Sequence, residues 1–388
     1  MHTATLTPPS NNTFVPVAGL LFFAIASGFL MSLIPLSLTS FSISESFAPW
    51  LATIFYLGLL MGATGIESVI SKIGHRKAFI CFLSLLILTI VTMIFFHSAA
   101  IWLISRFVAG ISVAGIFVVV ESWLLMGGNK SQRAKRLGLY MTALYGGSAF
   151  GQLAIGYIGI TGATPFLCVI LLLMIALLPP LLIKSGQPSQ QKNHKMRLSE
   201  LKNLSQPGLF GCLVSGLLLG PIYGLLPLYT SGRVENAEQI GLLMAVIIVG
   251  GMVVQPIVSY LSPRMSKSLL MAFFCLFAIL SVIGILTTSS VMVLLFNYLI
   301  LGACSFALYP IAITLACDSL PSEKIVSATE VMLLSYSAGS VLGPLLAFSF
   351  HHYEHGLILY IGLCLITTCI YMLYKSIPKA PEGNCPLV

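Results

Sequence analysis

One charged residue lies deep inside a long apolar run, and its chemistry is the first clue to function. Arg106 falls within the segment 100–125, whose only other charge is Glu121. If this segment crosses a membrane, a guanidinium near its centre costs roughly 2.5–3.5 kcal/mol, so it should face a cavity or a partner. The pattern predicts a polar contact for an anionic solute. The alternative is that Arg106, about five residues or 8 Å from the predicted helix end, extends its side chain to the membrane surface.

The other residues in apolar runs that could contact a solute are tyrosines and amides. Many tyrosines and few charges favour an amphipathic or weakly polar solute, held by ring stacking and single hydrogen bonds. The alternative for each is a hydrogen bond to a neighbouring helix. The candidates are Tyr56, Tyr140, Tyr145, Gln152, Tyr223, Gln255, Asn297, Tyr298 and Tyr336.

Glu121 is the second charge of the segment that holds Arg106. The two lie about 22 Å apart along a helix, so they cannot pair. Basic residues of the neighbouring polar gaps, Lys72, Arg76 and Arg133, are expected within its reach. An ion pair of this kind at a surface contributes about 0–1 kcal/mol.

The loop His351-His352-Tyr353-Glu354-His355 matches H-x-x-E-H, a zinc-peptidase signature. That chemistry needs a helix in a soluble catalytic domain, whereas these residues read as a short polar turn. His351, His352 and His355 are therefore only a weak metal or pH-sensing candidate. No Cys-x-x-Cys pair occurs, so we expect no metal and no cofactor.

Composition defines the class of protein. Of 388 residues, 57% are apolar and 8% are charged, against about 25% charged in a soluble domain. The mean hydropathy is +1.00. The net charge of +8 is spread over short gaps between apolar runs, which excludes the basic face of a nucleic-acid-binding protein. No phosphate-binding loop is present, so ATP is not expected to drive the protein. The sequence predicts a polytopic membrane protein.

Twelve apolar segments are long enough to cross a bilayer as helices, which predicts an all-α fold. They are continuously apolar rather than alternating, which excludes a β-barrel. The segments are 14–38, 48–70, 78–96, 100–125, 136–160, 164–183, 209–231, 238–261, 268–287, 291–316, 325–350 and 356–375. The polar stretch 184–208 divides the chain into two six-helix bundles, 1–183 and 209–388, joined by a cytoplasmic linker.

The distribution of basic residues predicts the orientation. With the N-terminus inside, 17 of the 19 Lys and Arg residues fall in cytoplasmic gaps, and only Arg106 and Arg233 do not. Basic residues are retained on the cytoplasmic side of membranes. Both termini are therefore expected in the cytoplasm.

The two halves repeat each other at an offset of 192 residues. At this offset Gly28 corresponds to Gly220, Pro35 to Pro227, and Lys72 to Arg264. Small residues spaced four apart let helices approach closely. The residues assigned to helix packing are Gly110, Gly147, Gly151, Gly339, Gly343 and Pro344. The layout predicts two parallel repeats around a central site.

Several motifs resemble those of the major facilitator superfamily. Ser71-Lys72-Ile73-Gly74-His75-Arg76-Lys77 resembles its basic loop after span two, and Arg106-x-x-x-Gly110 resembles its span-four motif. The glycines at 138, 147, 151 and 156 resemble the series of its antiporters. Gly115-Ile-Phe-Val-Val-Val-Glu-Ser-Trp-Leu, with the basic loop, is similar to its YcaD-like bacterial branch.

This resemblance implies a fold, a membrane and a gate. It implies a secondary transporter that works by alternating access in a bacterial inner membrane, as a monomer and without enzymatic activity. Its partners would be lipid, a small-molecule substrate and protons, with Arg106 as a coupling element. The resemblance also implies a cytoplasmic gate that forms and breaks an ion pair, built from Lys72, Gly74, Arg76, Lys77, Glu121 and Arg133.

The sequence departs from the family pattern at two informative positions. Ser71 replaces the acidic residue of the basic loop, and Gln152 replaces the proline that follows the third glycine of the antiporters. Efflux of an amphipathic compound is slightly favoured. Two alternatives are uptake of a nutrient, amino acid or metal chelate, and a membrane receptor that transports nothing. No nucleophile and base meet at mid-span, which argues against an intramembrane enzyme.

Overall fold

The computed structural model describes residues 13–63, 65–125, 130–183, 205–317 and 325–377. In these ranges every regular element is a helix and no strand is present. The N-terminal half contains α1 (Phe14–Ser37), η1 (Thr39–Phe41), η2 (Glu45–Phe47), α2 (Ala48–Ala63), α3 (Ile66–Ile73), α4 (His75–Phe95), α5 (Ala99–Leu125), α6 (Lys130–Ile158) and α7 (Thr164–Leu182). The C-terminal half contains α8 (Gln206–Gly224), α9 (Leu226–Ser231), α10 (Ala237–Leu261), α11 (Lys267–Thr287), α12 (Val291–Cys317), α13 (Ile325–Phe348) and α14 (Gly356–Ser376).

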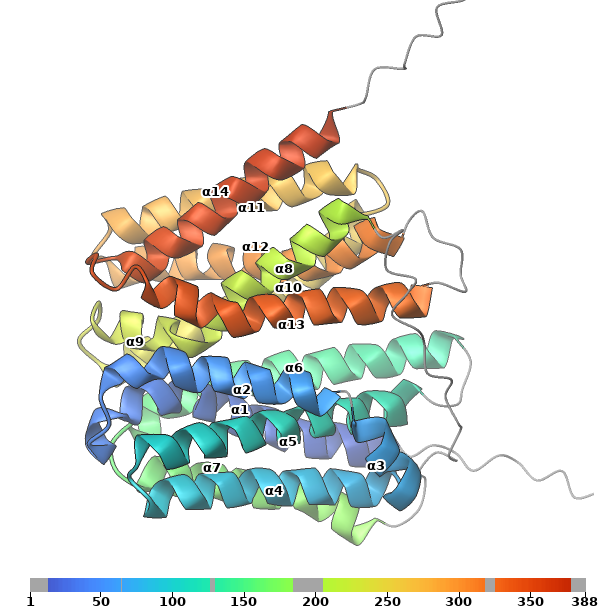
Figure 1. The fold of residues 1–388 in the computed structure, drawn as a ribbon, viewed down its shortest axis with the longest axis vertical. Helices are drawn as coiled ribbons and strands as arrows, with labels where there is room; N and C mark the ends of the chain where they lie inside the picture. The colour runs from blue at the N-terminus through green and yellow to red at the C-terminus, as the bar shows by residue number, and fades with distance from the viewer. Residues whose placement is uncertain (1–12, 64, 126–129, 184–204, 318–324, 378–388) are drawn as a thin grey trace, which may run out of the picture.

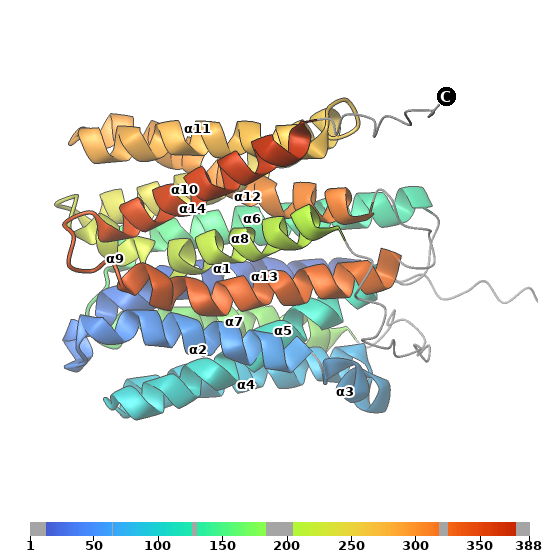
Figure 2. The same ribbon diagram turned by 45° about the horizontal axis from the view of Figure 1, so that its top comes forward.

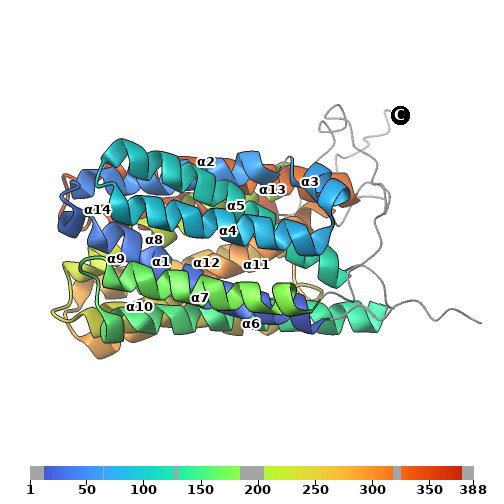
Figure 3. The same ribbon diagram turned by 90° about the horizontal axis from the view of Figure 1, so that it is seen from below.

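Each of the twelve predicted spans corresponds to helical structure. Within the described ranges, eleven helices are long and apolar enough to cross a membrane. The twelfth, α6, runs beside them (Figure 3) but is less apolar because it carries Gln152 together with several glycines and tyrosines. The fold is therefore the expected all-α arrangement of twelve spans.

Two predicted spans are broken helices rather than continuous ones. The segment 48–70 divides into α2 and α3, and 209–231 divides into α8 and α9. The second break has a clear cause: Pro227 has no N–H to donate to the carbonyl of Tyr223, and its ring would clash with that carbonyl. The helix accordingly ends at Gly224, and Leu225 leaves helical geometry with φ of −125°.

In Figure 1 the helices form two groups, each built from one half of the chain, and in Figure 2 α6 runs alongside helices of the other half. The groups meet where α6 packs on α10 and where α2 packs on α13 and α8. We call the end at which α7 stops and α8 starts the linker side, and the opposite end the far side. The chain between α7 and α8 takes in most of the predicted linker, of which 184–204 lies outside the described residues.

The internal repeat is reproduced as backbone contact between helices. A Cβ added at Gly110 of α5 would lie 2.1 Å from the carbonyl oxygen of Phe55 in α2. A Cβ added at Gly302 of α12 would lie 2.0 Å from the carbonyl oxygen of Ile247 in α10. Both the glycines and their contacts are 192 residues apart. The α2–α5 and α10–α12 pairs therefore pack in the same way.

The same holds for α1 with α6 and for α8 with α13. A Cβ at Gly151 would lie 2.1 Å from the carbonyl oxygen of Ile25, and a Cβ at Gly343 would lie 2.8 Å from that of Leu217. A Cβ added at the preceding glycine of each series, Gly147 or Gly339, would also lie within 3.0 Å of a backbone oxygen of α1 or α8. Pro344 is buried in this packing and lies near Gly220.

We expect Gly110→Ala and Gly302→Ala to lower stability by similar amounts. Each methyl group would overlap a backbone oxygen of the neighbouring helix, and overpacking of this kind costs about 1–3 kcal/mol. The melting temperature of the detergent-solubilised protein measures the effect. Gly138→Ala is the matched control because nothing lies within 4 Å of its Cβ position, and it should be neutral or stabilising. Equal melting temperatures for all three variants would contradict the packing role.

Candidate functional site

Arg106 is held in the interior of the bundle without a counter-ion. Its side chain is 9% exposed, and its Nε has no hydrogen-bond partner. The guanidinium lies over the ring of Phe55, 4.1 Å from the ring centroid. Close packing of α2 and α5 at Gly110 brings this ring under the charge. Within the described residues no ion pair reaches Arg106, and Tyr56 is the polar neighbour in electrostatic range.

Aromatic side chains from both halves converge next to Arg106. Tyr145 of α6 and Tyr223 of α8 pack edge-to-face against Phe306 of α12, with ring centroids 5.8 and 5.7 Å away. Tyr309 of α12 and Tyr336 of α13 lie 4.9 Å apart. Tyr223 is in electrostatic range of Tyr56, Tyr145 and Tyr336. We call these residues the central aromatic cluster: Tyr56, Tyr145, Tyr223, Phe306, Tyr309 and Tyr336.

Most of the cluster lies at mid-depth, whereas Tyr223 is next to the last residue of α8, and the tyrosine side chains retain accessible surface. Its five tyrosines are half-buried although they lie among the inner helices. Measured from the far-side end of each helix at 1.5 Å per residue, Arg106 is about 10 Å deep and Tyr336 about 18 Å deep. Phe306 is about 22 Å deep on the same scale. Phenol hydroxyls, ring faces and one guanidinium thus face a common region between the two halves.

The far side of this region is closed by contacts between the halves. Thr53 Oγ1 of α2 donates a hydrogen bond to the carbonyl oxygen of Val341 in α13, at 3.0 Å. A Cβ added at Gly224 of α8 would lie 2.5 Å from the Cβ of Ala52 in α2. These residues lie nearer the far-side ends of their helices than the cluster does, so they cover it from that side.

Toward the linker side, Glu121 lies below the cluster on α5. It is exposed, about 33 Å from the far-side end of its helix, and its Oε1 accepts a hydrogen bond of 2.7 Å from the hydroxyl of Tyr140. Arg76, expected as its partner, instead donates to the carbonyl oxygens of Pro180 and Leu181 at the end of α7. Among the described side chains, the expected ion pair between Glu121 and Arg76 is therefore not formed in this conformation.

The rest of the predicted gate surrounds a tight turn between α3 and α4. Gly74 occupies this turn with φ of 81°, a conformation that favours glycine. The turn places His75 against α5, where its Nε2 lies 3.1 Å from Ser122 Oγ. Lys72 and Lys77 are exposed, whereas the side chain of Arg133 lies outside the described residues.

Four predicted solute contacts are engaged in packing instead. Gln152 is fully buried and joins α6 to α1, because it accepts from Ser32 Oγ and donates to the carbonyl oxygen of Gly28, both at 2.7 Å. Tyr298 bonds Thr230 at 2.9 Å. Asn297 donates to the carbonyl oxygen of Val293 within its own helix, and Gln255 does the same to Gly251.

Sequence reasoning missed Phe55, Phe306 and Tyr309. Phenylalanines in apolar runs resemble core residues, and only the pairing of helices from different halves brings these rings to the site. One signal was available for Tyr309, which lies three residues from Phe306 on the same helix face.

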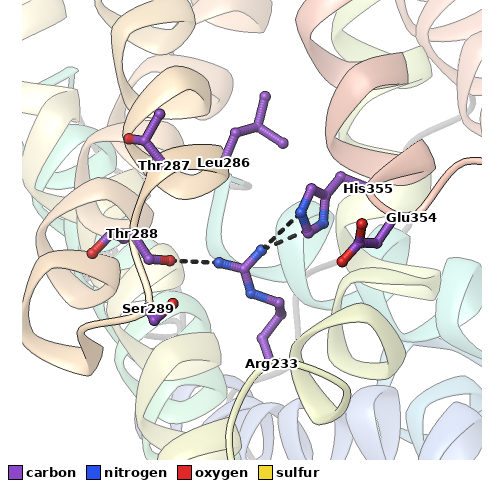
Figure 4. A pocket seen from close by; sticks show the side chains of 7 residues that line it. All are labelled: Arg233, Leu286, Thr287, Thr288, Ser289, Glu354 and His355. Carbon is purple, nitrogen blue, oxygen red and sulfur yellow. Dashed lines mark hydrogen bonds between the residues drawn. The ribbon is translucent and has the colours of Figure 1, made fainter.

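A separate polar pocket lies at the far side of the C-terminal half (Figure 4). It has a volume of about 270 Å³ and is lined by Arg233, Leu286, Thr287, Thr288, Ser289, Glu354 and His355. Arg233 donates to the carbonyl oxygens of Ile285 and Thr288 at the end of α11 and approaches the ring of His355. His351 stacks on Phe348. Within the described residues no group of three metal-ligating side chains is present.

The arrangement of helices is that of known membrane transporters. A solved structure of a mutant of the nucleoside transporter NupG superposes with a TM-score of 0.79, over 93% of this chain and 98% of that one, at 10% identity. A mutant of the Escherichia coli fucose:proton symporter FucP superposes with a TM-score of 0.60, over 94% and 98% of the chains, at 15% identity. At these identities the likeness establishes the fold.

Sequence similarity establishes the family. Residues 17–344 match the Major Facilitator Superfamily. The chain is 30% identical over 376 residues to the uncharacterized MFS-type transporter YcaD of Salmonella enteritidis PT4, covering 94% of this chain and 96% of that protein. YcaD of Salmonella typhi matches equally well. The chain belongs to the Major Facilitator Superfamily and is a multi-pass membrane protein, as the motifs indicated.

Proposed function

We propose that this protein is a secondary transporter that moves a small amphipathic organic solute by alternating access, as a monomer and without enzymatic activity. The observation that carries the proposal is the central aromatic cluster. Its rings come from both halves and most of them lie at mid-depth, and Arg106 adds one cation. A site shared by two halves is exposed to either side in turn when the halves rock against each other.

The conformation supports a particular assignment of sides. Seventeen of the 19 basic residues lie in the gaps on the linker side, which assigns that side to the cytoplasm of a bacterial inner membrane. The far side, closed at Thr53 and Gly224, is then the outside. On this assignment we infer that the conformation is inward-facing, with Glu121 exposed and not paired with Arg76.

A wedge at the closed side should shift the protein toward the outward-facing state. Gly224→Val would push the halves apart at Ala52. In a background without native cysteines, a thiol introduced by Tyr56→Cys reports far-side access to an impermeant maleimide. We expect the wedge to raise its labelling severalfold. Labelling of a thiol introduced by Glu121→Cys, measured from the linker side, should fall.

Gly138→Val is the control for this experiment because its Cβ position meets nothing within 4 Å. It should leave both labelling rates unchanged. No ligand is needed, so the result bears on alternating access alone. Unchanged rates in the Gly224→Val protein would favour a receptor that never opens its far side.

We place the cytoplasmic gate at Glu121 and the basic loop that contains Arg76. In the outward-facing state Glu121 would release Tyr140 and form an ion pair with a basic side chain of that loop. This ion pair would stabilise the closed cytoplasmic gate. We expect Glu121→Gln to bias the protein inward and to lower far-side labelling of the Tyr56→Cys thiol about two- to fivefold, as an ion pair worth about 0–1 kcal/mol allows. Glu45→Gln, an exposed acid on the far side, is the control. Equal labelling in both variants would remove Glu121 from the gate.

We propose further that the direction is export in exchange for protons. The glycine series of α6 supports this because it resembles that of antiporters, and two of its members, Gly147 and Gly151, pack against α1. In proteoliposomes that contain a pH-sensitive dye, exchange requires solute and protons to cross in opposite directions. Movement in the same direction would establish symport and uptake.

A further inference from the structure

We propose that the transported solute is an organic monoanion with a flat apolar body, and that its carboxylate or equivalent acidic group binds Arg106. The inference rests on the proposed transport function and names the substrate class. It begins from an unusual feature of Arg106: its charge is nine-tenths buried and its Nε has no partner. Buried charges in proteins are nearly always paired.

The chain itself cannot supply the missing counter-ion. It has 11 acidic residues, and each of them lies in a polar gap or within two turns of a helix end. Within the described residues, none forms an ion pair with Arg106. The ring of Phe55, 4.1 Å away, stabilises the cation from one face only. The edge of the guanidinium, where its N–H groups point, remains available.

The chemistry of that edge selects the ligand. A guanidinium offers parallel N–H donors that match the two oxygens of a carboxylate, and such charge-assisted bonds are about twice as strong as neutral ones. Burial of the Arg106 side chain lowers the local dielectric constant and strengthens the attraction. An ammonium ion would be repelled by Arg106. A neutral solute would leave the cation unpaired.

The remainder of the solute is defined by the central aromatic cluster. Phe306 presents its ring between Tyr145 and Tyr223, and Tyr336 lies next to Tyr309. Rings in this arrangement favour stacking with a flat apolar group. Their hydroxyls can donate single hydrogen bonds. Glu121 is in electrostatic range of Tyr309, but it accepts a hydrogen bond from Tyr140 and lies about 22 Å from Arg106 along α5. It is therefore too far away to pair with Arg106, and the site fits an organic monoanion.

Two sets of matched probes test the charge class directly. The first is benzoate, benzamide and benzylammonium; the second is indole-3-acetate, indole-3-acetamide and tryptamine. Within each set the ring is constant and the charge changes. We expect the acid of at least one set to raise the melting temperature of the purified protein in a concentration-dependent manner. The matching amide and amine should bind at least tenfold more weakly.

Variants then assign the selectivity to Arg106. Arg106→Gln should weaken binding of the acid roughly 10- to 100-fold, since a hydrogen bond to a charged group is lost in a dry site. Arg106→Lys keeps the charge but lacks the parallel N–H donors of the guanidinium, so we expect an intermediate loss of affinity for the acid. Arg264→Gln, at an exposed position on the linker side, is the control and should bind as the unaltered protein does. If Arg106→Gln does not fold, selectivity of the unaltered protein across the two sets still decides the question.

Three results would overturn the proposal. They are equal binding of an amide or amine, unchanged binding of the acid by Arg106→Gln, and no stabilisation by either acid. In each case the Arg106 guanidinium would be a structural cation held by Phe55. The labelling experiment with Gly224→Val needs no solute, so it separates failure of this substrate class from failure of the transport function.

Discussion

The close approach of helix backbones at glycine is the constraint on which this structure depends. In lipid the hydrophobic effect does not drive helices to associate, so close van der Waals packing at small residues must stabilise their association. Here Gly110 and Gly302 allow α5 and α12 to touch the backbones of α2 and α10. The same contacts also position the side chains that lie one helical turn away. Phe55 is placed under Arg106 because its own carbonyl is the neighbour of Gly110.

The interface between the two halves is held by a different set of contacts. The far-side contacts there are a hydrogen bond from Thr53 and several close approaches of glycines. A Cβ added at Gly224 of α8, Gly156 of α6 or Gly241 of α10 would lie 2.5–2.6 Å from an atom of the other half. A hydrogen bond of this type contributes only about 0.5–1.5 kcal/mol, so it can be broken when the halves rock. Tight packing within each half lets each half move as one body, and the contacts between the halves are those that must change when the two bodies move.

The sequence predicted the fold well because its signals are local. Span length, the positions of basic residues and the 192-residue offset need no knowledge of packing. The site was only partly predictable. Arg106 and four of the cluster tyrosines were identified because polar groups in apolar runs are conspicuous, but Gln152 and Tyr298 have the same appearance and are consumed in packing. Phe306 could not be distinguished from a core residue. Tertiary contacts determine which helix faces meet, and these contacts cannot be predicted from the local pattern of a single sequence.

The departures from the repeat indicate where function lies. Packing glycines obey the offset, whereas the residues of the proposed site do not. The position equivalent to Arg106 in the second half is Tyr298, a buried residue that forms a hydrogen bond with Thr230. The position equivalent to Glu121 is Ile313. Duplicated structure is retained where both halves need the same contact. A charge present in only one half is not required by the fold, and it carries the cost of burial. In our proposal the buried charge of Arg106 is retained because the guanidinium binds the solute.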